Sequence, residues 1–282
     1  MIALTRIRTE EAIPSKYRRP GVLKHGRDLL EIRRTDGDYT TSFWKRAKDQ
    51  LKRETHGKCA YCEADTATTA HGDVEHYRPK KTYWWLTYCY DNYLYSCQIC
   101  NQSYKGDWFP VTGDPLALDP SVPDPVDEGL DQAVLDGHAA RLAPDPIADG
   151  EGRDAFYRAS RAEKAWIPNP YEVDPAELFA WEADDVLKTV DVVRRGRGVR
   201  SKRAVEAAVE HLGLNRDELQ GKRWKEYRKA LAFARTLRDP GISDETREDT
   251  RFMLADMAAA DAPYAGMIRY FLAEWGLKEL LP

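Results

Sequence analysis

Four of the five cysteines in this 282-residue chain form two Cys-x-x-Cys pairs, and this pattern constrains the fold more than any other feature. The first pair is Cys59 and Cys62, the second is Cys97 and Cys100, and 34 residues separate them. Each pair presents two sulfurs from one tight turn, so the two pairs can supply four thiolates to one tetrahedral Zn²⁺. A zinc ion with four thiolate ligands has no open position, so any hydrolysis must rely on other residues.

Polar side chains suited to phosphodiester hydrolysis lie between the pairs and just after them. Glu75 and His76 occur in a short β-like run, and Asn101 follows the last cysteine four residues before Lys105. A neutral imidazole can take a proton from water near working pH. A carboxylate and an amide oxygen are ligands for Mg²⁺ or Mn²⁺. We expect two strands leading into a helix, with His76 as general base, Glu75 and Asn101 as metal ligands, and Lys105 holding the phosphate.

The geometry of this run leaves one question open. Adjacent residues of a strand point to opposite faces, so Glu75 and His76 share a site only where the strand ends or twists. Three more cations follow His76, and with Lys105 they are the predicted contacts to nucleic-acid phosphates. They are Arg78, Lys80 and Lys81.

The order of these motifs resembles that of HNH (ββα-metal) endonucleases with a four-cysteine zinc. More narrowly, the chain resembles the HNH nuclease that accompanies an ATPase in Septu-type bacterial anti-phage systems and in some retrons. The residues that carry this likeness are Val74-Glu-His-Tyr-Arg-Pro-Lys80, Trp85-Leu86, Cys97-x-x-Cys100-Asn101 and Phe109-Pro110, with a weaker echo at Leu212-Gly-Leu-Asn-Arg216. The strong motifs cover residues 59 to 110.

The resemblance implies a role for each polar residue of the predicted site. In that family the histidine is the general base, the preceding acidic residue and the final asparagine bind the divalent metal, and a middle asparagine braces the loop. Those residues are His76, Glu75, Asn101 and Asn92 here. Asp73 is an alternative metal ligand, because many HNH proteins carry Asp where this chain has Glu75.

Composition favours a folded protein without a membrane span. Hydrophobic residues make up 42% of the chain, with 8 Trp and 15 Tyr, which is ample for a core. We find no run of about 18 apolar residues and no signal-peptide pattern at the N-terminus, so we expect a cytoplasmic protein with no membrane partner. Zinc-spaced cysteines with one odd residue, Cys89, also suit a reducing compartment.

Charge and periodicity divide the chain into four parts. The formal net charge of −4 splits into +5 for residues 1–113, −13 for 114–185 and +4 for 186–282. We expect a mostly helical α+β fold: a basic, irregular arm at 1–37 with a short helix at 27–33, a zinc-stapled HNH core at 38–113, an acidic loop-rich insertion at 114–193, and a helical domain at 194–282. A helix is expected at 41–56, a hairpin or extended segment within 166–193, and four helices from residue 201 onward.

The leading hypothesis is a DNA endonuclease controlled by a separate ATPase subunit. The chain has no Gly-x-x-x-x-Gly-Lys-Ser/Thr phosphate loop, so nucleotide control would come from that partner. The acidic insertion would screen DNA until the partner moves it, and the basic run at 194–203 is either a phosphate-backbone contact or an exposed linker. Two alternatives are an RNA-cleaving enzyme with the same site and a non-catalytic zinc module that binds nucleic acid or protein.

Overall fold

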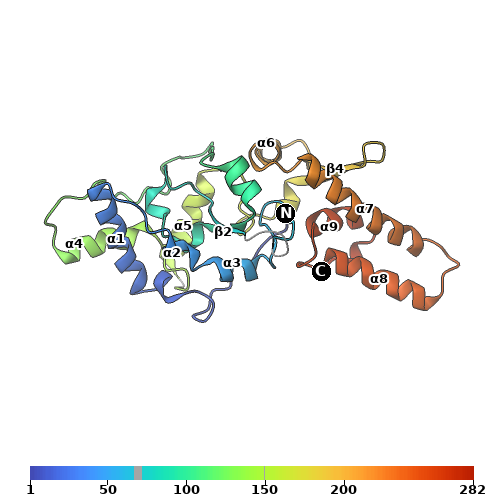
Figure 1. Cartoon of the computed structure of the whole chain (residues 1–282), viewed down its shortest axis with the longest axis horizontal. Helices are drawn as coiled ribbons and strands as arrows, with labels where there is room; N and C mark the ends of the chain where they lie inside the picture. Colours follow the sequence, from blue (N-terminus) through green and yellow to red (C-terminus); the bar gives the residue numbers. More distant parts are fainter. Residues whose placement is uncertain (67–71, 149) are drawn as a thin grey trace.

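The computed structural model describes residues 1–66, 72–148 and 150–282. The molecule is elongated, and both chain ends lie near its middle (Figure 1). Helix α1 (Gly21–Thr35) and helix α4 (Gln132–Leu142) form one end. Helices α7 (Asp217–Leu237) and α8 (Asp244–Ala258) reach the other end. The cysteine-bearing segment occupies the region between them.

The central segment contains the predicted strand–strand–helix order. Strand β1 (Asp73–His76) pairs antiparallel with β2 (Tyr93–Ser96), with His76 opposite Tyr93. A seven-residue π-helix, η4 (Ile99–Lys105), follows directly. Two short 3-10 helices, η2 (Trp84–Leu86) and η3 (Tyr90–Asn92), connect the strands. The aromatic residues of this connection are mostly buried, so they form core rather than an exposed stacking surface.

The N-terminal part is more regular than the sequence suggested. Helix α1 spans 15 residues, twice the expected length, and packs against α4. A Cβ added at Gly26 would lie 2.8 Å from the Cβ of Ala139, so glycine permits this close approach. The single helix expected at 41–56 is instead two, α2 (Ser42–Lys45) and α3 (Lys48–Glu54), separated by a turn. A 3-10 helix, η1 (Ser15–Tyr17), precedes α1.

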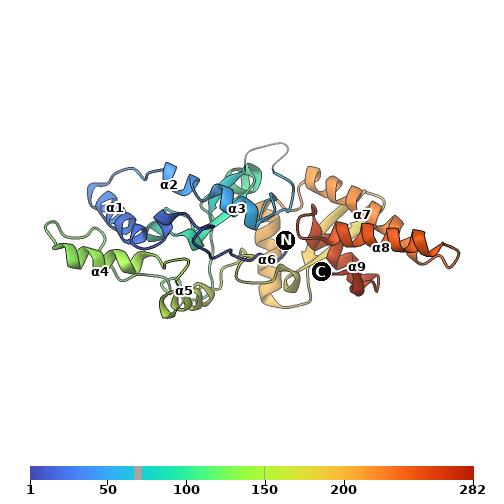
Figure 2. The same cartoon turned by 90° about the horizontal axis from the view of Figure 1, so that it is seen from below.

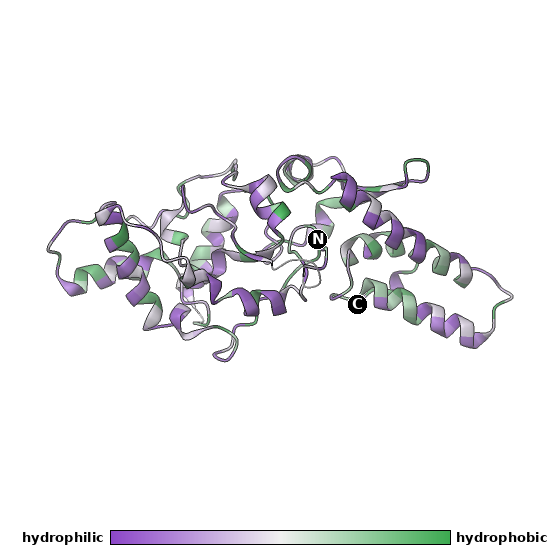
Figure 3. Cartoon of the chain, viewed as in Figure 1, coloured by the Kyte–Doolittle hydropathy of each residue, from purple (hydrophilic) through white to green (hydrophobic). Residues whose placement is uncertain are grey.

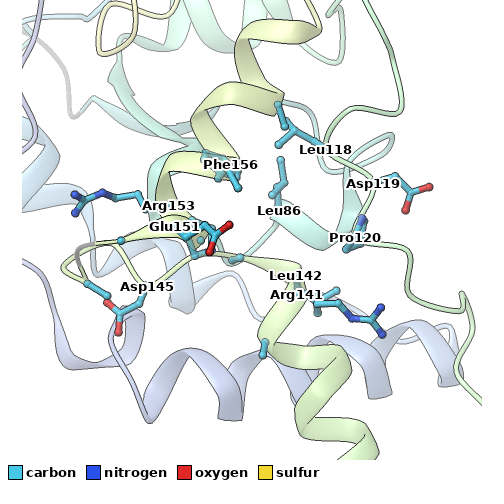
Figure 4. A pocket seen from close by; sticks show the side chains of 18 of the residues that line it. Leu86, Leu118, Asp119, Pro120, Arg141, Leu142, Asp145, Glu151, Arg153 and Phe156 are labelled. Carbon is cyan, nitrogen blue, oxygen red and sulfur yellow. The ribbon is translucent and has the colours of Figure 1, made fainter.

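The acidic insertion contains two helices, α4 and α5 (Glu151–Ala162), although its proline-rich sequence predicted loops. Its carboxylates pair with the basic arm: Asp136 with Arg27, and Asp124 with Arg33 at 2.7 Å. Figure 2 shows α1 and α4 side by side, as in Figure 1. These ion pairs connect the acidic insertion to the basic arm. Screening of DNA by the insertion stays a prediction. A cavity of about 520 Å³ opens between α4 and α5 (Figure 4).

The C-terminal part follows the predicted pattern. Strands β3 (Phe179–Asp184) and β4 (Thr189–Arg194) form the hairpin, and a 3-10 helix, η5 (Pro175–Glu177), precedes it. Four helices follow: α6 (Val199–Leu212), α7, α8 and α9 (Ala265–Glu274), and a last turn, η6 (Lys278–Leu280), ends the chain. Hydrophobic and hydrophilic residues both occur along these helices (Figure 3). Across the described residues, no helix is long and apolar enough to cross a membrane.

One hydrophobic core joins the cysteine-bearing segment to the C-terminal helices. Its buried members come from both cysteine turns, from the β3–β4 hairpin and from the facing sides of α6 to α9. Leu212, Leu254 and Ile268 are examples from three of these helices. The cysteine pairs therefore lie at the junction of two parts of the molecule, not at its surface.

Candidate functional site

The four cysteines predicted to bind zinc converge in the folded chain. Their sulfur atoms all lie within 4.8 Å of one another, and Cys62 Sγ is 3.9 Å from Cys97 Sγ. A tetrahedron with Zn–S bonds of about 2.3 Å places its sulfurs about 3.8 Å apart. Three of the four thiols are buried, and Cys97 is half-buried. Four soft donors at this spacing fit a tetrahedral zinc with no position left for substrate.

Backbone hydrogen bonds shape the two cysteine turns. In the first, the N–H of Cys59 donates to Ala64 O and the N–H of Ala60 donates to Tyr95 O in β2. In the second, the N–H of Cys100 donates to Cys97 Sγ at 3.4 Å. The first turn is thereby attached to the strand pair and the second opens η4, which fixes the cluster relative to β1 and β2.

Positive groups from the C-terminal helices lie beside the cluster. Arg216 Nη1 is 3.6 Å from Cys100 Sγ and also donates to Gly213 O. Burial works against its charge, but the sulfurs of Cys100 and Cys62 raise the pKa of Arg216. Arg223 is fully buried, and its guanidinium lies over Trp181. These arginines offset the negative charge that four thiolates would bring.

His76 is held as a neutral imidazole with one free nitrogen. It is only 8% exposed, and burial together with the charge of Lys80 lowers its pKa to about 3. Its Nε2 lies 3.0 Å from Thr87 O. A carbonyl only accepts, so Nε2 carries the proton and Nδ1 keeps a lone pair. The rings of Trp44 and Tyr93 pack against the imidazole edge-on, with centroids 4.9 and 5.0 Å away.

Asn92 holds the chain that follows His76. Its Oδ1 accepts from the N–H of Arg78 at 2.9 Å, and its Nδ2 donates to Arg78 O at 3.0 Å and to Leu86 O at 3.3 Å. The side chain is fully buried. These bonds are the contacts that a loop-bracing asparagine would make.

Glu75 points away from His76 and meets Lys105. The two residues are 3% and 2% exposed, and Glu75 Oε1 lies 2.6 Å from Lys105 Nζ. Burial raises the pKa of Glu75, while the ammonium of Lys105 opposes that shift. Lys105 also donates to His76 O at 3.2 Å. The two neighbours on β1 thus contact different surroundings, as strand alternation requires.

Asp73 lies on the same face of β1 as Glu75, two residues away. Its Oδ2 accepts from Gln102 Nε2 at 2.7 Å and lies 3.5 Å from Asn101 Nδ2. The first turn of η4 therefore contacts Asp73, and Lys105, the last residue of η4, contacts Glu75. The carboxylates of Asp73 and Glu75 and the amide oxygen of Asn101 are ligand types that suit a hard divalent cation. In this structure the Glu75 carboxylate is paired with the ammonium of Lys105.

The predicted nucleic-acid contacts divide into two groups. Lys81 is exposed and Lys80 is half-exposed, with its ammonium 4.6 Å from the centre of the Trp44 ring. Arg78 and Lys105 differ from the expectation, because both are buried. Arg78 is 1% exposed and pairs with Glu163 at 2.7 Å. In this arrangement neither residue reaches a phosphate at the surface.

Sequence reasoning missed the partners of these groups. Thr87 and Trp44 contact His76, and Glu163 neutralises Arg78. Glu163 lies 85 residues from Arg78 in the chain. No local spacing rule connects such residues, so only the folded chain reveals them.

The fold and the cysteine cluster define an α+β chain with four cysteines positioned to hold a metal ion. Part of the chain is similar to the Septu protein PtuB of Bacillus mycoides (strain KBAB4), with 39% identity over 77 residues. The match covers 23% of this chain and 26% of that protein, so it spans about a quarter of each. No family model matches the chain, and no solved structure matches it.

Proposed function

We propose that the chain is an HNH-type endonuclease that hydrolyses phosphodiester bonds in DNA with His76 as the general base. The observation that carries the proposal is the state of this histidine. Its Nε2–H donates to Thr87 O, which leaves the lone pair of Nδ1 to accept a proton from water.

The remaining residues have roles that follow from their contacts. Glu75 and Asn101 of η4, with Asp73 on the same face of β1 as the alternative carboxylate, would hold Mg²⁺ or Mn²⁺, which supplies Lewis-acid stabilisation of the leaving oxygen when bound. Asn92 keeps the Arg78 backbone fixed and so orients the end of β1. Lys80, whose charge acts on both Glu75 and His76, replaces the buried Lys105 as the cation closest to an incoming phosphate. Lys81 would contact a phosphate of the DNA backbone further along the same DNA strand.

The biological setting rests on the similarity to the Septu protein. We infer that the chain acts in anti-phage defence in the cytoplasm, with a separate ATPase subunit as its partner. The shared segment has 39% identity over 77 residues, which supports a related role for that segment. Cleavage with and without a candidate ATPase partner tests this inference.

The decisive experiment compares cleavage of plasmid DNA and of a structured RNA by the wild-type protein and by His76→Ala, with Mg²⁺ or Mn²⁺. Loss of the general base is expected to reduce cleavage by about 10²-fold or more. His138→Ala is the matched control, because His138 lies on α4 and is hydrogen-bonded to Arg141 rather than to a residue of β1 or η4. It should cleave like the wild type.

Zinc content and the unfolding midpoint of each variant must be measured in parallel. The proposal fails if His76→Ala retains zinc, folds and cleaves as fast as the wild type. Cleavage of RNA alone would assign the same site to the other substrate. Absence of any cleavage in a folded, zinc-bound protein with its partner would favour a binding module.

A further inference from the structure

A second cavity, of about 400 Å³, lies where three parts of the molecule meet. Its walls come from the residues just after β1, from the end of α5 with the segment that follows, and from the start of α6. The side chains around it are partly apolar, including Ile167, Pro168 and Leu178. A concave site of this size accommodates one small molecule.

The charged side chains at this cavity are mostly positive. Arg161, Lys164, Arg200 and Arg203 line it, against one carboxylate, that of Glu172. Glu172 is already engaged, because Ser160 and Asn169 donate to its two oxygens. Within residues 1–66, 72–148 and 150–282, none of the four cations forms an ion pair. Because these side chains are exposed or half-exposed, water screens their charges, and together they give the cavity a positive potential that attracts anions.

The start of α6 adds a second attraction for an anion. Gly198 precedes the helix and offers no side chain to cap it, and the first two helical residues, Val199 and Arg200, line the cavity. The free N–H groups at the start of a 14-residue helix and its dipole favour negative charge. The basic run at 194–203 comprises the loop before α6, with Gly196 and Gly198, and the first residues of the helix.

Buried donors without partners are a third, independent observation. Arg78 lines the cavity and is 1% exposed, yet its Nη1 has no hydrogen-bond partner among the described residues. The indole N–H of Trp166, also in the cavity wall, likewise has none among them. Unsatisfied buried donors are costly, so their gathering at one cavity indicates a missing acceptor.

From these observations we propose that the cavity binds a small phosphate-bearing molecule of nucleotide size. Phosphate oxygens would lie near the α6 N-terminus with Arg161 and Arg200, and the rest of the ligand would contact the apolar wall. A nucleic-acid backbone fits less well, because it needs an open track of phosphate contacts, whereas these cations surround a single hollow. The inference does not depend on nuclease activity.

Binding to the full chain is tested by calorimetry with ATP, inorganic pyrophosphate and adenosine at low salt. ATP and pyrophosphate are expected to bind, and adenosine is expected to bind far more weakly. The double variant R161S/R200S removes two exposed cations at the cavity and is expected to weaken pyrophosphate binding about tenfold or more. Both side chains are exposed, so folding should survive.

The matched control is K222S/K225S, which removes two exposed charges from α7 away from the cavity lining. Its affinity for pyrophosphate should equal that of the wild type. Equal weakening in both double variants would mean non-specific charge attraction and would overturn the proposal. Failure of both ATP and pyrophosphate to bind the wild-type protein would also overturn the proposal. The same holds if R161S/R200S binds pyrophosphate as the wild type does and loses only the binding of an oligonucleotide.

Discussion

The two polar centres beside the β1–β2 pair differ in how their charge is balanced. At the cysteine cluster, four thiols meet with no cation among them, and the nearest positive group, Arg216, stands outside at 3.6 Å from Cys100 Sγ. At the acidic face, the protein supplies its own cation, because Lys105 lies 2.6 Å from Glu75. Both centres use η4, whose start carries Cys100 and whose end is Lys105.

This difference in charge balance distinguishes a structural centre from a centre whose cation can be exchanged. The four sulfurs of the first centre are positioned to hold a metal ion, and we propose that zinc, once bound, completes this centre. The second is already neutral as an ion pair, and a divalent cation would have to displace or share the ammonium. We therefore expect zinc to be tightly retained and Mg²⁺ or Mn²⁺ to bind weakly and exchangeably.

The largest effect should come from Cys59→Ser, which removes one of four zinc ligands. Because the metal's binding energy is also folding energy, the variant should lose its zinc and several kcal/mol of stability. Metal analysis and urea unfolding measure both quantities. Cys89→Ser is the control, since Cys89 is a buried thiol outside the cluster. Retention of zinc by Cys59→Ser would refute the closed-site interpretation.

The sequence predicted the first centre more fully than the second for a physical reason. Each cysteine pair is a local turn, so its spacing alone determines where the sulfurs point. The strand–strand–helix order and the β3–β4 hairpin are likewise local patterns and are confirmed. The Glu75–Lys105 pair depends on how η4 packs against β1, which no spacing rule encodes.

Long-range packing also explains the differences elsewhere. Helix α1 begins at Gly21, before the expected start at Arg27, and α4, more than 90 residues later, packs against this added part at Gly26. In the sequence motif, Arg78 is a reasonable candidate for a phosphate contact. In the folded chain it is buried and forms an ion pair with Glu163 at the end of α5. A linear sequence shows the charge of a residue and leaves its partner unspecified.

A second prediction concerns the ion pair itself. Lys105→Met leaves the Glu75 carboxylate buried without its counter-charge, and breaking such a pair costs about 3–5 kcal/mol. Added Mn²⁺ should then stabilise the variant more than it stabilises the wild type, because the cation replaces the lost ammonium at Glu75. Thermal unfolding with and without Mn²⁺ measures the difference.

Lys81→Met provides the control for Lys105→Met, because Lys81 is exposed and has no ion pair within the described part of the chain. Its melting temperature should match that of the wild type in either condition. If Lys105→Met is as stable as the wild type and equally insensitive to Mn²⁺, then the acidic face is an ordinary buried pair and the contrast between the two centres disappears.

The smallest expected effect tests the outer shell of the cysteine cluster. A zinc ion with four thiolates carries a net charge of about −2, and Arg216 from the start of α7 offsets part of it. Arg216→Met should therefore speed zinc transfer to a chromophoric chelator by about tenfold, the low end for outer-shell changes, because Arg216 is only half-buried. Arg228→Met, which removes an exposed charge on the same helix, should leave the rate unchanged. Equal rates in all three proteins would mean that the thiolates need no charged partner from the C-terminal helices.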